Sequence, residues 1–183
     1  MNASIWWWLL AAGTLFWLVG LYNRIARQRA RAIEVLGVLE KQVRACAALI
    51  LAHHNVLISE AEQRSSLFDS EERWLHAVKA AQWVDTVWGD ASRNTLHPSI
   101  QKRRSESWQA LRTAWSHLLA RPVDLAGAPV PEDLKTAWES NASKAVAVQN
   151  ALNTILATYD GWVQEFPARL VTRLMGFEVS ASI

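Results

Sequence analysis

The chain has 183 residues, a single cysteine and a formal net charge of only +2. This length fits one domain with a real core and a short additional segment. The weak net charge argues against a nucleic-acid partner. A lone Cys46 excludes an intramolecular disulfide and agrees with a reducing compartment.

The chain opens with an apolar run from Ile5 to Leu21, and no basic residue precedes it. A cleavable signal peptide would need a basic start and a small-residue cleavage site, so residues 1–22 are interpreted as a transmembrane anchor. Arginines follow the run, which predicts an outside N-terminus and a cytoplasmic remainder. The expected anchor and interface residues are Trp6, Trp7, Trp8, Trp17, Tyr22, Arg24, Arg27, Arg29 and Arg31.

Residues 23–166 are predicted to form an all-α, antiparallel four-helix bundle in which the first and last helices are long. No Gly/Pro/Ser-rich linker separates the anchor from the first helix, so the two are expected to be continuous. Steps of three and four place one seam of that helix in the core. The seam consists of Ala32, Leu36, Leu39, Val43, Cys46, Ile50, His53 and Leu57.

Three further helices are bounded by caps and breakers. Ser70 is expected to cap the second helix, which ends at Gly89. The third is expected between Pro98 and Pro122, and the fourth has Pro131 at its first position. The core seam of the fourth is predicted as Leu134, Trp138, Asn141, Ala145, Val148, Leu152, Ile155, Tyr159, Trp162 and Phe166.

Seven of the eleven tryptophans fall within these last three helices. Core packing is expected for them rather than a ligand cage. They are Trp74, Trp83, Trp88, Trp108, Trp115, Trp138 and Trp162. The second and third helices are also expected to bury Leu75, Val78, Val84, Val87, Ile100, Leu111, Leu118 and Leu119.

Up-down-up-down connectivity would return the fourth helix to the membrane. Residues 167–183 are therefore interpreted as an amphipathic return segment and tail. Its expected membrane-surface residues are Arg169, Leu170, Arg173, Leu174 and Phe177. The alternative is that this segment caps the open end of the bundle.

Short motifs stand at both ends of the chain, in fixed order behind the apolar run. They consist of Tyr22, Asn23, Leu49, Ile50, Asn153, Tyr159, Phe166, Pro167, Gly176 and Phe177. In this order they resemble the LemA family of bacterial membrane-anchored helical proteins. Leu51 stands where the family has proline, and the tail reads "EVSASI", so the chain is similar to a divergent member.

The resemblance implies a single-pass protein of a bacterial inner membrane, with its N-terminus outside, a cytoplasmic helical bundle and no established enzymatic activity. Relatives are associated with membrane organisation, including magnetosome membranes. Some occur beside membrane zinc metalloproteases, so the resemblance implies a membrane protein such as a protease as one partner.

No catalytic residue, cofactor or metal site is expected. His53 and His54 are adjacent on a helix and point about 100° apart, so they cannot chelate one metal. His53 lies on the core seam and leaves a haem alternative open, with a second axial ligand from His76, His97 or His117. Cys46 is expected to be a small core residue.

Two function classes remain open. The first is a scaffold that binds the lipid bilayer and self-assembles as a homo-oligomer or organises other membrane proteins. Gly13 and Gly20 on one face of the anchor would let copies approach closely. The second is a membrane-anchored ligand-binding sensor with a pocket lined by Trp108, Trp115, Trp138 and Tyr159.

Overall fold

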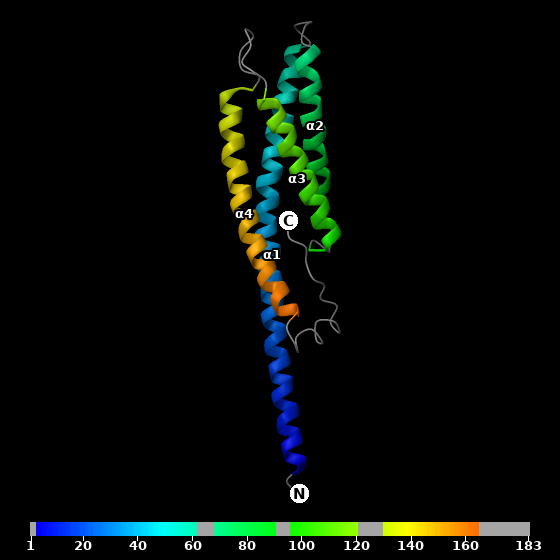
Figure 1. Cartoon of the computed structure of the whole chain (residues 1–183), viewed down its shortest axis with the longest axis vertical. Coiled ribbons are helices and arrows are strands. Elements are labelled where there is room, and N and C mark those ends of the chain that lie inside the picture. The colour runs from blue at the N-terminus through cyan, green and yellow to red at the C-terminus, as the bar shows by residue number, and fades with distance from the viewer. Residues whose placement is uncertain (1–2, 62–67, 91–95, 121–129, 165–183) are drawn as a thin grey trace.

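The computed structural model describes residues 3–61, 68–90, 96–120 and 130–164. This part of the chain forms the helices α1 (Ala3–Ala61), α2 (Phe68–Gly89), α3 (Pro98–Leu119) and α4 (Glu132–Gln164), as Figure 1 shows. No strand occurs among these residues, which confirms the all-α prediction for them.

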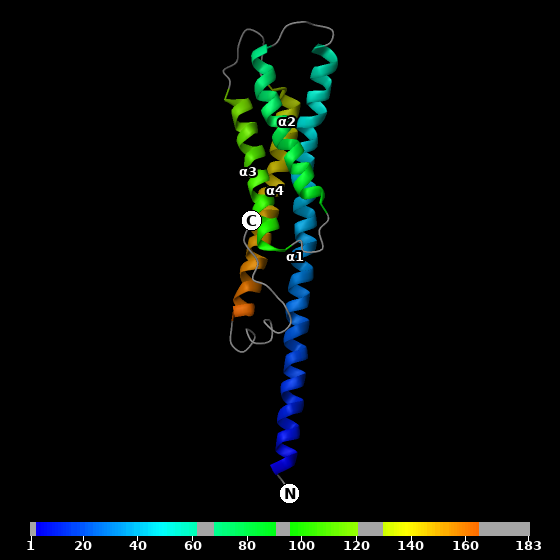
Figure 2. The same cartoon turned by 90° about the vertical axis from the view of Figure 1, so that its right-hand side faces the viewer.

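The helices lie along one long axis and alternate in direction (Figures 1 and 2). α1 packs against both α2 and α4, and α2 packs against α3. Neighbouring helices with short connections can only run antiparallel, which explains the alternation. The predicted up-down-up-down arrangement is therefore confirmed.

α1 is one unbroken helix of 59 residues, or about 88 Å at ~1.5 Å per residue. It contains no proline, and alanine and leucine, both good helix formers, are its most frequent residues, so no residue interrupts the hydrogen-bond ladder. The expected continuity between the N-terminal apolar run and the first bundle helix is confirmed. Among the described residues, no helix combines the length and apolar character that crossing a membrane requires. The span over residues 1–22 stays a prediction.

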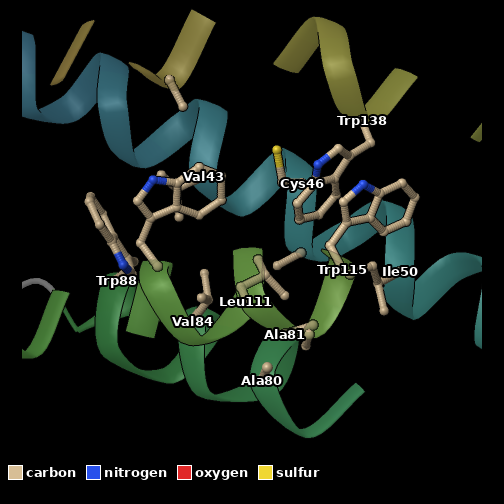
Figure 3. Packing of buried hydrophobic residues seen from close by; sticks show 14 of the residues in the cluster. Val43, Cys46, Ile50, Ala80, Ala81, Val84, Trp88, Leu111, Trp115 and Trp138 are labelled. Carbon is tan, nitrogen blue, oxygen red and sulfur yellow. The ribbon is translucent and has the colours of Figure 1, made fainter. Parts of the chain in front are cut away.

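The predicted seam of α1 forms one wall of the core. Its members from Ala32 to Ile50 are buried, and His53 and Leu57 at the far end are partly buried. Figure 3 shows Val43 and Cys46 facing the other helices of the bundle, with Leu111 of α3 among the packed side chains. The alternating steps of three and four keep these side chains on a single face of α1.

The predicted seam of α4 is also confirmed over its described side chains. Leu134, Trp138, Ala145 and Leu152 are buried, and Asn141, Val148 and Ile155 are partly buried. Leu156 is buried although it was not predicted, because a straight helix with 3.6 residues per turn drifts from a strict heptad seam. Outside the described side chains lie Tyr159, Trp162 and Phe166.

Three predicted core side chains lie at the surface instead. Leu75, Trp83 and Leu119 are 44%, 40% and 37% exposed. Each is a direct chain neighbour of a buried residue: Trp74, Val84 and Leu118, respectively. Successive residues on a helix point about 100° apart, so the buried neighbour occupies the core and these predictions were wrong.

The starts of α2 and α4 differ from the predictions, whereas α3 starts at Pro98 as predicted. α2 begins at Phe68, so Ser70 lies inside its first turn instead of capping it. α3 is capped by His97, whose Nδ1 accepts a hydrogen bond from the Ser99 N–H at 3.3 Å, and this cap was not predicted. α4 begins at Glu132, directly after Pro131, whose carbonyl accepts from the Lys135 N–H at 3.0 Å.

Candidate functional site

The N-terminal part of α1 extends beyond the other helices of the bundle (Figures 1 and 2). α2 and α3 accompany only the far half of α1, and α4 continues further toward the N-terminus than they do. The described structure therefore tapers from four helices to two and then to α1 alone.

The side chains of this projecting part are apolar and exposed on every side. Trp6, Trp7 and Trp8 are 72%, 72% and 76% exposed, and Phe16 is 84% exposed. Three consecutive residues about 100° apart cover most of the helix circumference. The other exposed apolar or aromatic side chains here are Leu9, Leu10, Leu15, Trp17, Val19 and Tyr22. A helix that is apolar all round is stable only in apolar surroundings, so this surface, which we call the apolar collar (residues 6–22), is the candidate functional site.

Four exposed arginines follow the apolar collar. Arg24, Arg27 and Arg31 are spaced by three and four residues, which places them on one face of α1. They line one open surface hollow together with Gln28, Ala30 and Glu34. Arg29 is two residues from both Arg27 and Arg31, and a step of two is about 200°, so it lies on the other side of the helix.

The other residues predicted from the family resemblance lie at the surface, in the core or outside the described part of the chain. Asn23 is exposed and its carbonyl accepts a hydrogen bond from Arg27 Nε at 3.2 Å. Leu49 and Asn153 are partly buried and Ile50 is buried, so the pair Leu49-Ile50 has a packing role. Outside the described residues lie Phe166, Pro167, Gly176 and Phe177, and the remaining surface residues Arg169, Leu170, Arg173 and Leu174.

Comparisons with family models, curated proteins and solved structures give no match to this chain. The likeness to the LemA family therefore depends on the short motifs alone. What the protein does has to be inferred from the surfaces and clusters that its own residues form.

A buried polar cluster lies at the ends of α2 and α3 and was not predicted. Gln101, Arg104 and Ser107 of α3 are each at most 1% exposed. The Arg104 guanidinium lies 5.3 Å from the ring centroid of Trp88, and the Trp88 Nε1–H donates to Ser107 Oγ at 3.1 Å. Ser107 Oγ in turn donates to the Arg104 carbonyl at 2.9 Å. These contacts fix the register of α3 against the end of α2.

Two arginines, Arg104 and Arg44, make the charge interactions described at this end of the bundle. Burial lowers the pKa of Arg104 from its usual range, and the negative charges of Glu40 and Asp90 partly oppose this effect. Arg44 on α1 forms an ion pair with Asp85 on α2, with 2.9 Å between Nη2 and Oδ1. The pair is exposed, so it is expected to contribute at most about 1 kcal/mol to stability.

The sequence did contain a signal for Arg104. The buried series Leu118, Trp115, Leu111 and Trp108 steps back along α3 by three and four residues. One more step of four reaches Arg104. Reading the series by spacing alone, without stopping at the first charged residue, would have placed this arginine inside.

Three tryptophans fill the space between α3 and α4. The Trp115 and Trp138 rings are stacked with centroids 4.4 Å apart, and Trp108 stacks on Trp138 at 6.2 Å. Figure 3 shows Trp115 and Trp138 beside Cys46 of α1. Because these rings contact each other, the geometry supports core packing for them rather than the lining of a ligand pocket.

Cys46 and the described histidines do not form a common redox or metal site. Burial raises the pKa of Cys46 to about 12, so its thiol stays protonated at neutral pH and is not a nucleophile. The His53 ring packs against the Trp74 ring, with 4.9 Å between the two ring centroids. The second axial ligands considered for a haem, His76, His97 and His117, are all exposed. Among the described residues, no group of three or more His, Cys, Asp or Glu side chains could hold a metal ion.

Proposed function

We propose that the protein is a membrane-anchored, non-catalytic helical bundle of the LemA type at the cytoplasmic face of a bacterial inner membrane. In this role it is a scaffold that self-assembles or organises other membrane proteins. The observation that carries the proposal is the apolar collar, which extends beyond the bundle and is exposed around its whole circumference.

The energetics of the apolar collar support insertion into a bilayer. Moving one large apolar side chain out of water contributes about 1.5–3 kcal/mol. The collar presents ten such exposed apolar or aromatic side chains, so insertion would far exceed the strength of a single lipid anchor. Tryptophans favour the membrane–water interface, where the indole ring is apolar and its N–H is hydrated, and this suits the cluster Trp6, Trp7 and Trp8.

The asymmetry of charge supports the orientation. Four arginines follow the collar between Arg24 and Arg31, and none of residues 1–5 is basic. Arginines close to a membrane segment are retained on the cytoplasmic side. The bundle would then project into the cytoplasm along the axis of α1.

Membrane anchoring is tested by extracting cell membranes with alkaline carbonate. We expect the full-length protein to remain in the pellet, and a variant with Leu9, Leu10, Leu15 and Phe16 changed to serine to appear in the supernatant. The control variant changes Val56, Ile58, Leu75 and Leu119 to serine, four side chains that are also exposed but belong to the bundle. Release of both variants, or of neither, would contradict a specific role of the collar.

The depth and direction of insertion are measured with a protease site placed before Trp6. Cleavage from outside the intact inner membrane is expected if the collar crosses the bilayer. Protection from outside, with cleavage in inverted vesicles, would mean that the collar enters one leaflet only and would overturn the outside N-terminus.

Self-assembly is tested by light scattering of the full-length protein in mild detergent, with the detergent mass subtracted. A mass of several protomers is the expected result. A monomer would remove the self-assembly part of the proposal and would favour an adaptor that binds another membrane protein.

A further inference from the structure

The basic residues next to the apolar collar are arranged as a one-sided site. Arg24, Arg27 and Arg31 line one open hollow, and Glu34 is the acidic residue described there. The hollow therefore carries a formal charge of +2 from its described lining. Arg29 lies at the same height along α1 but on another side, and it does not line the hollow.

We propose that this hollow binds the phosphate of an anionic phospholipid headgroup. The inference rests on the proposed membrane anchoring, because that places the hollow at the right depth. The headgroup layer extends about 5–8 Å beyond each side of the hydrocarbon core. Arg24 and Arg27 lie about 3 Å and ~7.5 Å beyond Tyr22 along α1, within that layer. Arg31 lies about 13.5 Å beyond Tyr22, and its long side chain can reach back toward the layer because helix side chains incline toward the N-terminus. A guanidinium offers a planar fork of N–H donors that matches the oxygens of a phosphate.

The arrangement goes beyond a general attraction of positive charge to a negative surface. Residues spaced by three, four and seven lie above one another on a helix, so three guanidinium groups can surround one or two phosphates from the same side. The Arg27 side chain is held by the hydrogen bond that its Nε–H donates to the Asn23 carbonyl at 3.2 Å. The apolar collar directly below the hollow supplies the surface on which the acyl chains of the same lipid would lie.

The site is tested by native mass spectrometry of the full-length protein in mild detergent with added phosphatidylglycerol or phosphatidylcholine. Three proteins are compared: the wild type, R27Q/R31Q and the control R29Q/R103Q. Both variants lose two positive charges, and Arg103 is an exposed residue of α3 in the bundle. Loss of one charge-assisted hydrogen bond to a phosphate weakens binding by roughly tenfold, so R27Q/R31Q is expected to bind phosphatidylglycerol at least roughly tenfold more weakly. The control is expected to keep nearly the wild-type affinity.

Equal losses in the two variants would overturn the site, because they would mean that only the total charge matters. Equal retention of phosphatidylcholine and phosphatidylglycerol by the wild type would also overturn it. In a further arm, inorganic phosphate is added in excess. If it displaces the lipid from the wild type at concentrations that also bind without lipid, the ligand is free phosphate and the assignment to a lipid is wrong.

Glu34 provides a check in the opposite direction. Removing its negative charge with E34Q should tighten phosphatidylglycerol binding by a few-fold and leave phosphatidylcholine binding unchanged. Carbonate extraction of the same variants distinguishes failure of the headgroup site from failure of the membrane anchoring. R27Q/R31Q should stay in the membrane pellet, so loss of the wild type from that pellet would contradict the anchoring itself, not the headgroup site.

Discussion

Trp138 is expected to be the largest single aromatic contributor to the stability of the bundle. It is 4% exposed and stacks on both Trp115 and Trp108, so it joins α4 to α3. Changing Trp138 to alanine removes the indole ring and both stacked contacts. The space it leaves is enclosed by side chains that cannot all move inward.

The expected loss of unfolding free energy in Trp138→Ala combines the loss of burial and the loss of ring stacking. Truncation of a buried tryptophan to alanine costs about 3–5 kcal/mol, including the cavity that remains. Within that total, the closer stack on Trp115 is expected to account for about 1 kcal/mol beyond burial. A domain of this size has a total unfolding free energy of roughly 5–15 kcal/mol, so Trp138→Ala should remove a large part of it. Trp138→Phe keeps one aromatic ring and should cost about half as much.

The assay is urea unfolding of the full-length protein in mild detergent, followed by circular dichroism of the helices. Trp83→Ala is the matched control, since Trp83 is 40% exposed and should cost about 1 kcal/mol or less. A double-mutant cycle with Trp115→Ala measures the coupling between the two rings directly. Equal losses for Trp138→Ala and Trp83→Ala, or a coupling energy of zero, would refute the role given to the stack.

Three further predictions use the same unfolding assay. The pKa of Cys46 is raised from 9.0 to about 12 in the folded state, so its contribution is complete below pH 9 and is lost as pH rises toward 12; Cys46→Ala should lose less stability than the wild type across that interval, and parallel pH profiles would contradict this. Arg104→Ala should cost about 3 kcal/mol because it leaves a cavity and removes the charge near Glu40 and Asp90, whereas Arg104→Met keeps most of the volume and should cost less; the reverse order would contradict the packing argument. Deleting residues 168–183 should leave the unfolding midpoint unchanged and weaken liposome binding or reduce the mass in detergent; a lower midpoint would mean that this segment belongs to the bundle.

The long seams of α1 and α4 could be predicted from the sequence because spacing alone determines which face of a helix is buried. The positions from Ala32 to Ile50 recur at steps of three and four, and no other pattern in that region competes. Helix boundaries were predictable where proline or glycine marks them, as at Gly89 and Pro98. The helical continuity through residues 22 and 23 followed from the absence of any breaker.

The details within α2 and α3 could not be predicted in the same way. α2 has tryptophan, leucine and valine on several faces, so hydrophobicity does not distinguish buried Trp74 and Val84 from exposed Leu75 and Trp83. Arg104 was missed because a charged residue is normally assigned to the surface. The spacing of the buried residues in α3 indicates which face Arg104 occupies. The partners of Arg104 are Trp88 of α2, Glu40 of α1 and Asp90 directly after α2, and these are not apparent in the local sequence of α3.

The taper of the bundle determines which surfaces a membrane partner could reach. Arg44 contacts Asp85 close to the end of α2, and along α1 this level lies about 33 Å from Tyr22 at ~1.5 Å per residue. With the apolar collar in the bilayer, as proposed, α2 and α3 would begin well above the membrane surface. Among the described helices, only α1 and α4 continue toward the N-terminal end of α1 beyond α2 and α3.

A partner embedded in the same membrane should therefore contact the narrow part of the molecule and not its wide end. This is tested with a photo-crosslinking residue at Ile33, close to the middle of α1, or at Leu75, near the start of α2; the two side chains are similarly exposed at 42% and 44%. Crosslinks to other membrane proteins or to a second copy are expected from Ile33 in intact cells. If Leu75 gives the same crosslinks as strongly, the partner reaches the wide end of the bundle, and the rigid continuity of α1 does not determine where binding occurs.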